Sequence, residues 1–346
     1  MLLLLSIMVI IIITFAFVFS FSKADNSRIH PENGVLDLEN WEPDRDGVLS
    51  LSGEWDFFWK RFVSYPEAAG GSLKPDAVVD TPGVWNNYKI DGRKLPGFGY
   101  GTYRLKVVNV PEGIPLALRI PTFSTAYELY INDRLVSSNG MVGADEKHFE
   151  PGYLPQVVEF TPEDSGFTLI FYVSNFTYAR GGMWYAVNMG APEQIRGMDK
   201  AIADKDLFLF GALTVMAFYY LIIFLLRRED RSSLFYVFMC ILFAGRTAIY
   251  GDYLIYRLVP FISFRAIINI SYITMCWFSV CSAFMVRELF PEESIQGGLY
   301  LCFRHDAVIF DHTYFLFYPI CEHRTGICHT LWRLLRIYLE YRIYQG

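Results

Sequence analysis

The chain is poor in charged residues, and cysteine is missing from its first two thirds. Asp, Glu, Lys and Arg make up 19% of the 346 residues, whereas hydrophobic residues make up 53%. A soluble protein carries about a quarter charged residues, so this balance disfavours a wholly soluble chain. The first cysteine is Cys240, so the residues before it contain no disulfide and depend on a packed core.

The sequence also lacks a basic stripe and the short motifs of the common enzyme classes. It has no phosphate-binding loop, nucleophile elbow, zinc-protease helix or dinucleotide fingerprint. The adjacent acids Asp145-Glu146 and Glu163-Asp164 are typical of solvated loops, whereas a glycosidase holds two carboxyl groups about 5 to 9 Å apart. The net charge of −6 disfavours nucleic acid. We therefore expect no catalytic residues, no cofactor and no nucleic-acid partner.

Long uncharged runs account for the apolar excess. Residues 1–24 begin with such a run and are expected to be a signal peptide or an N-terminal anchor. About 20 apolar residues span a bilayer as a helix, which predicts membrane helices at about 207–226, 232–251 and 266–286. Membrane lipid is therefore an expected partner of residues 207–290.

The arginines between the first two predicted spans indicate the orientation. Arg227, Arg228 and Arg231 lie in this short connection, and cytoplasmic loops are rich in Lys and Arg. The first span then runs from outside to inside. This predicts a multi-pass protein of the cell membrane whose residues 25–198 are extracellular, in agreement with an export segment at the N-terminus.

Residues 25–198 have the pattern of an all-β domain. Tyr103, Leu105 and Val107 alternate with polar residues, as in a strand that is buried on one face. Asn139-Gly140 is typical of a tight turn. Many short strands separated by turn residues predict an antiparallel sandwich, followed by a short polar stalk at 199–206.

A series of ordered motifs gives this pattern a family resemblance. The motifs are Leu51-Ser-Gly-Glu-Trp-Asp-Phe57, Thr81-Pro-Gly-Val-Trp-Asn86, Gly97-Phe-Gly-Tyr-Gly-Thr-Tyr-Arg-Leu105, Ser124-Thr-Ala-Tyr-Glu-Leu-Tyr-Ile-Asn132, Val173-Ser-Asn-Phe176, Arg180-Gly-Gly-Met-Trp184 and Asp206-Leu-Phe-Leu-Phe-Gly211. Over roughly residues 40 to 293 the chain resembles the seven-transmembrane receptors with diverse intracellular signalling modules (7TMR-DISM). The resemblance implies an extracellular jelly roll of the galactose-binding type, similar to the sugar-binding domain of family 2 glycosidases. It also implies seven membrane helices and a cytoplasmic output such as a kinase, a cyclase or a phosphatase.

The chain departs from this pattern near its end. Three spans are predicted instead of seven, no output module is recognised, and the resemblance stops near Glu293. Residues 291–346 are interpreted as a divergent tail, with a frameshift after Ser294 as one hypothesis. The tail contains Cys321, His323, Cys328 and His329, whose spacing fits no common structural zinc pattern, so we expect no metal site.

Aromatic and polar residues near predicted loops are the candidate ligand-binding residues. They are Trp85, Tyr127, Asn175, Arg180 and Trp184. Aromatic faces stack on sugar rings, but large aromatics more often fill a core, and both readings stay open for the tryptophans. Asn175 begins a glycosylation sequon, although a role in capping or turning the chain is favoured. Arg180 and Trp184 flank Gly181-Gly182, on what we expect to be a ligand-accessible loop.

Arg246 is a charged residue inside the second predicted span. A charge at this depth is costly unless it has a partner or water. Asp252, six residues on, is the expected partner, and a structural ion pair is favoured over a role in the signal path.

Three functions follow from these patterns. The first is a receptor fragment whose extracellular domain binds a small ligand, with carbohydrate as one candidate, and passes the signal to the helices. Its partners would be a second copy of the chain or another receptor or output chain. The second is a membrane-tethered carbohydrate-binding module without signalling, and a surface glycosidase comes last. A non-functional truncated receptor is a further alternative.

Overall fold

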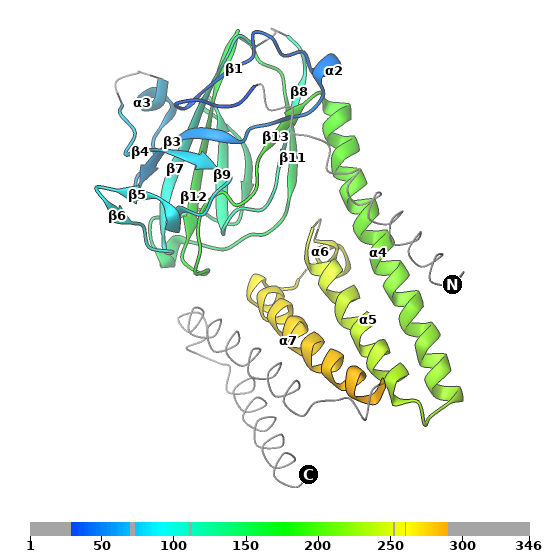
Figure 1. The fold of residues 1–346 in the computed structure, drawn as a ribbon. Coiled ribbons are helices and arrows are strands. Elements are labelled where there is room, and N and C mark those ends of the chain that lie inside the picture. The colour runs from blue at the N-terminus through cyan, green and yellow to red at the C-terminus, as the bar shows by residue number, and fades with distance from the viewer. Residues whose placement is uncertain (1–28, 70–72, 111–112, 252, 260, 290–346) are drawn as a thin grey trace.

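The computed structural model describes residues 29–69, 73–110, 113–251, 253–259 and 261–289, arranged as in Figure 1. Within these ranges a β-sandwich is followed by long helices, so the predicted fold class is confirmed. The predicted signal peptide or anchor (1–24) and the predicted divergent tail (291–346) lie outside the described residues.

The sandwich consists of two main sheets and a small hairpin. The strands are β1 (Val35–Asp37), β2 (Leu49–Ser50), β3 (Gly53–Trp59), β4 (Ala77–Thr81), β5 (Lys89–Ile90), β6 (Arg93–Lys94), β7 (Gly99–Val108), β8 (Leu116–Ile120), β9 (Ala126–Ile131), β10 (Arg134–Asn139), β11 (Gln156–Phe160), β12 (Gly166–Asn175) and β13 (Asn188–Gly190). The larger sheet has the order β10-β9-β12-β7-β3-β4, with β1 parallel to the end of β7, and the smaller sheet has the order β11-β8-β13-β2. Apart from β1, the paired strands in both sheets are antiparallel.

The alternation seen in the sequence sets the inner face of β7. Tyr103, Leu105 and Val107 are fully buried, while Lys106 between them is exposed. Side chains along a strand point to opposite faces, so the three apolar residues meet the core between the sheets. Trp55, Phe57 and Phe171 fill the same core from neighbouring strands. The core therefore stabilises the sandwich without disulfides, as expected for a domain of this size.

Strand β8 is buried on both faces. Leu116, Leu118 and Ile120 belong to the core between the sheets. Ala117 and Arg119 point the other way and are also buried, although they lie on the outer face of the smaller sheet. Contacts between α4 and β8, β11 and β13 show that a helix covers this outer face.

The helices follow the sandwich in the chain. They are α4 (Pro192–Leu226), α5 (Arg231–Ile249), α6 (Leu254–Leu258) and α7 (Phe264–Leu289), and short helices within the sandwich are α2 (Pro43–Asp46), α3 (Tyr65–Ala69), η1 (Trp85–Asn87) and η2 (Glu146–His148). Helix α5 packs against both α4 and α7. Helix α4 begins seven residues before the predicted stalk (199–206), so the stalk and the first predicted span form one helix.

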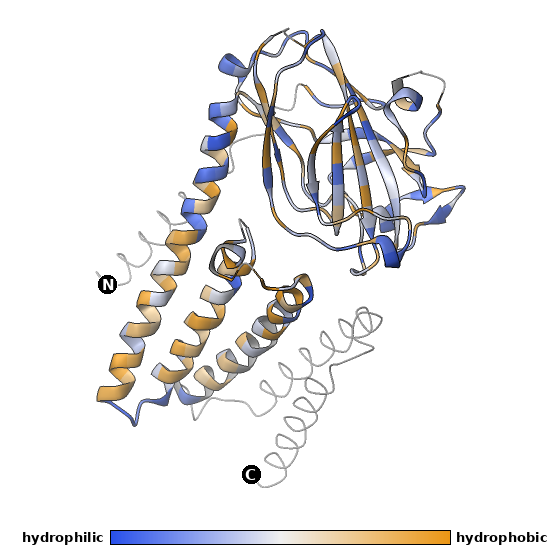
Figure 2. Cartoon of the chain, turned by 180° about the vertical axis from the view of Figure 1, so that it is seen from behind, coloured by the Kyte–Doolittle hydropathy of each residue, from blue (hydrophilic) through white to orange (hydrophobic). Residues whose placement is uncertain are grey.

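Helix α4 changes character along its length. At 35 residues it is about 50 Å long, which exceeds the thickness of a bilayer core. Figure 2 shows that the part beside the sandwich mixes hydrophilic and hydrophobic residues, whereas the far part is mostly hydrophobic. The turn between α4 and α5, at the end far from the sandwich, is hydrophilic in the same view. The far part of α4 therefore suits lipid, and the near part suits water and protein.

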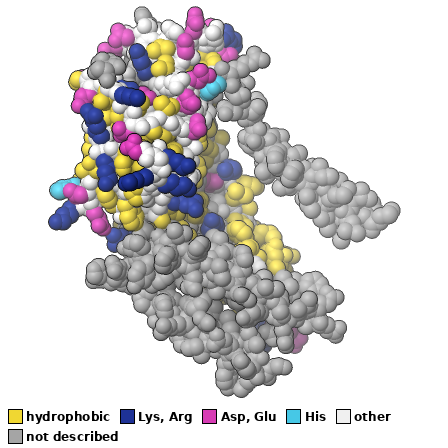
Figure 3. Space-filling model, turned by 60° about the vertical axis from the view of Figure 1, so that its left-hand side comes forward, with side chains coloured by type: hydrophobic (Ala, Val, Ile, Leu, Met, Phe, Trp, Pro, Cys, Tyr) yellow, Lys and Arg dark blue, Asp and Glu magenta, His cyan; other side chains and the backbone are white. Residues whose placement is uncertain are grey.

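Among the described residues, α4 and α5 are long and apolar enough to cross a membrane. Helix α4 contains the first predicted span, and α5 covers the second except for its last two residues, because the helix ends at Ile249. Helix α7 contains the third predicted span, whose crossing stays a prediction. The sandwich surface has a different composition. In Figure 3 basic and acidic side chains are interspersed over the visible face of the sandwich, as on a surface that faces water.

Candidate functional site: the junction between the sandwich and the helices

The smaller sheet runs directly into α4. Strand β13 pairs with β8 on one side and β2 on the other, and Ala191 alone separates its last residue from Pro192, the first residue of the helix. Proline suits this first helical position because its φ is already helical and no N–H is needed there. Strand β13 and α4 are therefore joined by a single residue.

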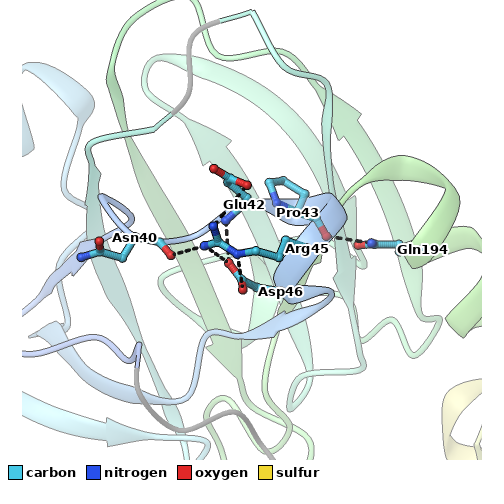
Figure 4. A network of polar contacts seen from close by, with 6 residues as sticks. All are labelled: Asn40, Glu42, Pro43, Arg45, Asp46 and Gln194. Carbon is cyan, nitrogen blue, oxygen red and sulfur yellow. Dashed lines mark hydrogen bonds and ion pairs between the residues drawn. The ribbon is translucent and has the colours of Figure 1, made fainter.

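A polar network holds the first turn of α4 (Figure 4). The side-chain amide of Gln194 donates to the carbonyl oxygen of Pro43 at 2.8 Å, and its oxygen accepts from the Ala191 N–H at 3.3 Å. Arg45 orders α2 by binding Asp46 at 2.9 Å and donating to the carbonyl oxygen of Asn40 at 3.0 Å. Helix α2 thus connects the start of the sandwich with the start of α4.

An open surface pocket adjoins this network. Its lining residues are Ile29, His30, Glu32, Asn33, Val35, Asp37, Glu39 and Asn40. The five predicted ligand-binding residues do not line it. Because the Asn40 carbonyl oxygen is bound by Arg45, the pocket is linked through α2 to the first turn of α4.

A charged contact then fixes α4 on the outer face of the smaller sheet. The guanidinium of Arg119 donates to the Asp199 carboxylate at 2.9 Å, and the Arg119 side chain is only 8% exposed. Ile195, one turn earlier on α4, is fully buried. Arg196 and Glu159 form a second pair at 2.6 Å with both side chains about half exposed. We call these two ion pairs the charge clamp.

An aromatic contact joins the sandwich to the segment between α5 and α7. Tyr253 is 5% exposed, and its hydroxyl shares a hydrogen bond with Thr122 at 3.3 Å. Its ring meets that of Tyr153 edge-on with 5.0 Å between centroids, and Tyr153 also packs on Phe264 at 5.3 Å. Burial raises the pKa of Tyr153 to about 12, so this hydroxyl stays neutral at physiological pH. We call these four residues the aromatic plug.

Two more contacts belong to this junction. The hydroxyls of Tyr178, in the loop before β13, and Tyr272, on α7, share a hydrogen bond at 3.0 Å. Gly251, with φ of +76°, lies against the carboxylate of Asp206 on α4, where a Cβ would collide with it. The loop after α5 therefore rests on α4 as well as on the sandwich.

Two of the predicted ligand-binding residues are core residues. Trp85 is fully buried, its indole N–H donates to the Gly97 carbonyl oxygen at 3.1 Å, and Gly181 packs on its ring. Tyr127 is also fully buried and shares a hydrogen bond with Ser137 at 3.2 Å. The binding prediction is corrected for both, because side chains with no exposed surface present nothing to a ligand. Their volume fills the sandwich instead.

Asn175 is likewise buried and organises a loop. Its side-chain amide donates to the carbonyl oxygens of Gly97 and Tyr178 at 2.8 and 2.6 Å, and its oxygen accepts from the Thr125 hydroxyl and the Tyr178 N–H at 3.1 and 3.0 Å. A side chain with this many internal bonds has no free group for a ligand. The structure therefore favours the turn-forming role that was weighed against the sequon.

Arg180 and Trp184 remain accessible candidates. Arg180 is exposed, and Trp184 is partly buried with its ring 5.3 Å from that of Tyr178. The Trp184 indole N–H is buried and has no acceptor among the described residues. Both lie on the loop that bonds α7 through Tyr178, so a ligand at this loop would lie next to the helices.

Arg246 contacts partners that the sequence did not show. Its guanidinium donates to the Ser271 carbonyl oxygen on α7 at 3.3 Å and lies 4.5 Å from the centre of the Tyr250 ring. Cation–π contacts of this kind stabilise a poorly hydrated charge. The predicted partner Asp252 lies outside the described residues, so that ion pair stays a prediction.

Sequence analysis missed the residues of the clamp and the plug. The sequence could have indicated Arg119, because it is the one charged residue in the strand Leu116-Ala-Leu-Arg-Ile120 and a charge in such a strand needs a partner. Nothing in the sequence indicated Tyr253, since a tyrosine between two helices is unremarkable there. Among the described residues, no group of three or more His, Cys, Asp or Glu side chains is placed to hold a metal.

The helical part of the chain is similar to a known family of membrane receptors. Residues 205–319 match the family model described as 7TM diverse intracellular signalling. The resemblance to this receptor family is confirmed over that range, and with the two apolar helices it makes the chain a membrane protein. The match continues past Glu293, so the resemblance ends later than the sequence analysis placed it.

The sandwich has distant likenesses among solved structures. A family 2 β-galacturonidase from Eisenbergiella tayi is 18% identical over 42% of this chain and 24% of its own, with a TM-score of 0.29. A putative β-galactosidase from Bacteroides fragilis is 20% identical over 41% and 22%, with a TM-score of 0.30, and a Ruminococcus gnavus β-glucuronidase is 15% identical over 44% and 30%, with a TM-score of 0.33. The chain thus spans less than a third of each. No curated protein matches the chain.

Proposed function

We propose that the chain is the sensor part of a membrane receptor. In this proposal the sandwich lies outside the cell, binds a small ligand and passes the change to the membrane helices. The direct passage of β13 into α4 through Ala191 carries the proposal, because it ties the sandwich to a helix that suits lipid. The family match over residues 205–319 supports a signalling role for these helices.

The orientation rests on charge. Arg227 and Arg228 lie in the turn between α4 and α5, at the end far from the sandwich, and Arg231 begins α5. Cytoplasmic loops carry such an excess of basic residues, so the sandwich would be extracellular. The chain would then act with a further copy of itself or with another receptor or output chain.

Carbohydrate is the ligand class that we propose to test first. The sequence resemblance to receptors with a galactose-binding-type jelly roll motivates this choice. Two surfaces are candidates for the contact: the loop with Arg180 and Trp184, and the pocket lined by Asp37 and Glu39. Each is connected to a helix, through Tyr178 to α7 or through α2 to α4, as a signalling ligand requires.

The test is a thermal-shift screen of the full chain in detergent micelles against a panel of mono- and oligosaccharides. A bound ligand raises the midpoint in proportion to ln(1 + [L]/Kd). A fragment that ends at residue 198 is unsuitable, because it would lose Asp199 and expose Arg119. A hit that is lost in Trp184→Ala but kept in Glu39→Gln places the ligand on the loop, and the reverse places it in the pocket.

A tethered binding module without signalling is the second candidate function. Hydrogen exchange of α4 and α7 with and without the bound sugar separates the two. Altered exchange in the helices supports the receptor, whereas a hit confined to the sandwich supports the tethered module. If no sugar in the panel shifts the midpoint, carbohydrate is the wrong ligand class.

A further inference from the structure

The sandwich is attached to α4 and to the other helices by different means. It continues into α4 through Ala191 and is held to it by the charge clamp. No described strand of the sandwich runs directly into α5 or α7. These helices contact the sandwich through Tyr253, in the α5–α7 connection, and through Tyr272, on α7. Helix α5 also packs against α4, so the position of α5 and α7 relative to the sandwich depends on that packing and on the contacts that the α5–α7 connection and α7 make with the sandwich.

From this arrangement we propose that Tyr253 is a positioning residue that couples the sandwich to α5 and α7. Its side chain is inserted between two sandwich loops, and its contacts with these loops hold the sandwich in position relative to α5 and α7. The proposal rests on the proposed function, since it names a second route by which a change in the sandwich reaches the membrane. The first route is α4 itself.

The contacts of Tyr253 come from both sides of the junction. Thr122, in the loop between β8 and β9, shares a hydrogen bond with its hydroxyl and is 2% exposed. Tyr153, in the loop before β11, covers its ring and packs on Phe264 in the first turn of α7. One side chain thus touches two sandwich loops, and through Tyr153 it is linked to the start of α7.

The backbone conformation of Tyr253 indicates that contacts with neighbouring residues hold its side chain in this position. Its φ of +52° and ψ of +49° are left-handed, a conformation that a bulky side chain rarely adopts. Such a residue persists only where surrounding contacts compensate for the strain. The hydrogen bond to Thr122 and the ring contact with Tyr153 are contacts of that kind.

The two routes meet at strand β8. Arg119 of the charge clamp and Thr122 of the aromatic plug are three residues apart, at the end of β8 and in the loop that follows. A shift of β8 along its axis therefore moves both contacts together. This gives a physical reason for a response of α4 and of α5–α7 to the same change in the sandwich.

The test measures two distances in the full chain in lipid nanodiscs. Spin labels replace exposed residues after the six cysteines have been changed to serine or alanine, and tryptophan fluorescence confirms the fold. One pair, Leu135 with Leu226, reports the sandwich against α4; the other, Leu135 with Ile241, reports the sandwich against α5. Distance distributions are compared for the unmodified Tyr253, Tyr253→Ala, Tyr253→Phe and, as a control, Phe261→Ala, at an exposed aromatic residue of the same connection.

We expect Tyr253→Ala to broaden the Leu135–Ile241 distribution and to leave the Leu135–Leu226 distribution unchanged. Tyr253→Phe keeps the ring contact with Tyr153, so its distributions should lie close to those of the unmodified chain. Phe261→Ala should leave both distributions unchanged. An unchanged Leu135–Ile241 distance in Tyr253→Ala, or equal broadening of both distances, overturns the proposal. No ligand is used, so this result is independent of the sugar screen that tests the receptor itself.

Discussion

The sandwich is attached to the helices by two contacts that differ in chemistry. The charge clamp on α4 joins ionised groups, one of which, the Arg119 guanidinium, is almost fully buried. The aromatic plug joins neutral rings and hydroxyls. A buried ion pair is costly to break because one charge is left without its partner, whereas ring contacts are lost gradually as the rings separate. The clamp is thus suited to a fixed attachment and the plug to one that is adjusted.

The largest loss of stability is expected when the buried ion pair of the charge clamp, Arg119 with Asp199, is broken. Asp199→Asn leaves the Arg119 guanidinium buried without a counter-charge, and the free energy of unfolding of the sandwich should fall by on the order of 3 kcal/mol. Denaturant unfolding followed by tryptophan fluorescence in micelles measures this. Asp204→Asn, at an exposed position of α4, is the matched control.

A second variant sharpens the explanation. Adding Arg119→Met to Asp199→Asn removes the uncompensated charge, so most of the lost stability should return. If the double variant is as unstable as the single one, the loss came from packing and not from the charge.

Gly251→Ala should have an intermediate effect, because it acts where the outer loop meets α4. The left-handed φ of +76° costs an alanine about 1 kcal/mol, and its Cβ would in addition collide with the Asp206 carboxylate. The matched control is Gly92→Ala, which has φ of +75° and no atom within 4 Å of the added Cβ. A larger fall in the thermal midpoint for Gly251→Ala than for Gly92→Ala is expected, and equal falls would show that contact with Asp206 contributes nothing.

The exposed half of the clamp should contribute little. Arg196 and Glu159 are 51% and 46% exposed, and solvent screens such pairs, so Arg196→Ala should lower the free energy of unfolding far less than Asp199→Asn does. The cost should vanish at high salt, whereas that of Asp199→Asn should persist. Unfolding curves of both variants at low and high ionic strength test this, and a salt-independent loss in Arg196→Ala would contradict it.

The two attachments should respond to opposite extremes of pH. The hydrogen bond from Arg196 holds the pKa of Glu159 below its usual value of 4.5, so its contribution is present above that pH and is lost as the pH falls further. Burial raises the pKa of Tyr153 from 10.0 to about 12, so the neutral hydroxyl supports the plug below pH 10 and this support is lost as the pH rises towards 12.

Each response has its own measurement. Glu159→Gln should reduce the stability difference between about pH 3 and about pH 6. Tyrosinate absorbance should show one fewer late-titrating group in Tyr153→Phe than in the unmodified chain. A tyrosine that titrates at its ordinary pH in the folded protein would show that the plug is open to water.

Local patterns predicted much of the fold correctly. The apolar run that ends at Leu226 coincides with the end of α4, and the alternation of Tyr103, Leu105 and Val107 coincides with the inner face of β7. Both are properties of neighbouring residues, because the length of an apolar run sets a span and a period of two sets a strand. The motif series likewise led to the receptor family that the helices match.

The candidate site was predicted less well. Trp85 and Tyr127 are residue types that are common in sugar-binding surfaces, but both side chains fill the core. The side chain of Asn175 forms its hydrogen bonds within the protein, where it organises a loop. A single aromatic or amide looks the same in the sequence whether it faces a ligand or a core. Arg180 and Trp184 remain candidates because Arg180 is exposed and Trp184 is only partly buried.

The sequence by itself determined that an acidic chain without stabilising disulfides in its first two thirds forms a β domain and then enters a membrane. Only the tertiary structure decided which residues join these parts. Arg119 and Asp199 are 80 residues apart in the chain, and Thr122 and Tyr253 are 131 residues apart. Hydropathy and strand period act between near neighbours, whereas contacts over such separations arise only when the packed sheets and helices bring distant residues together.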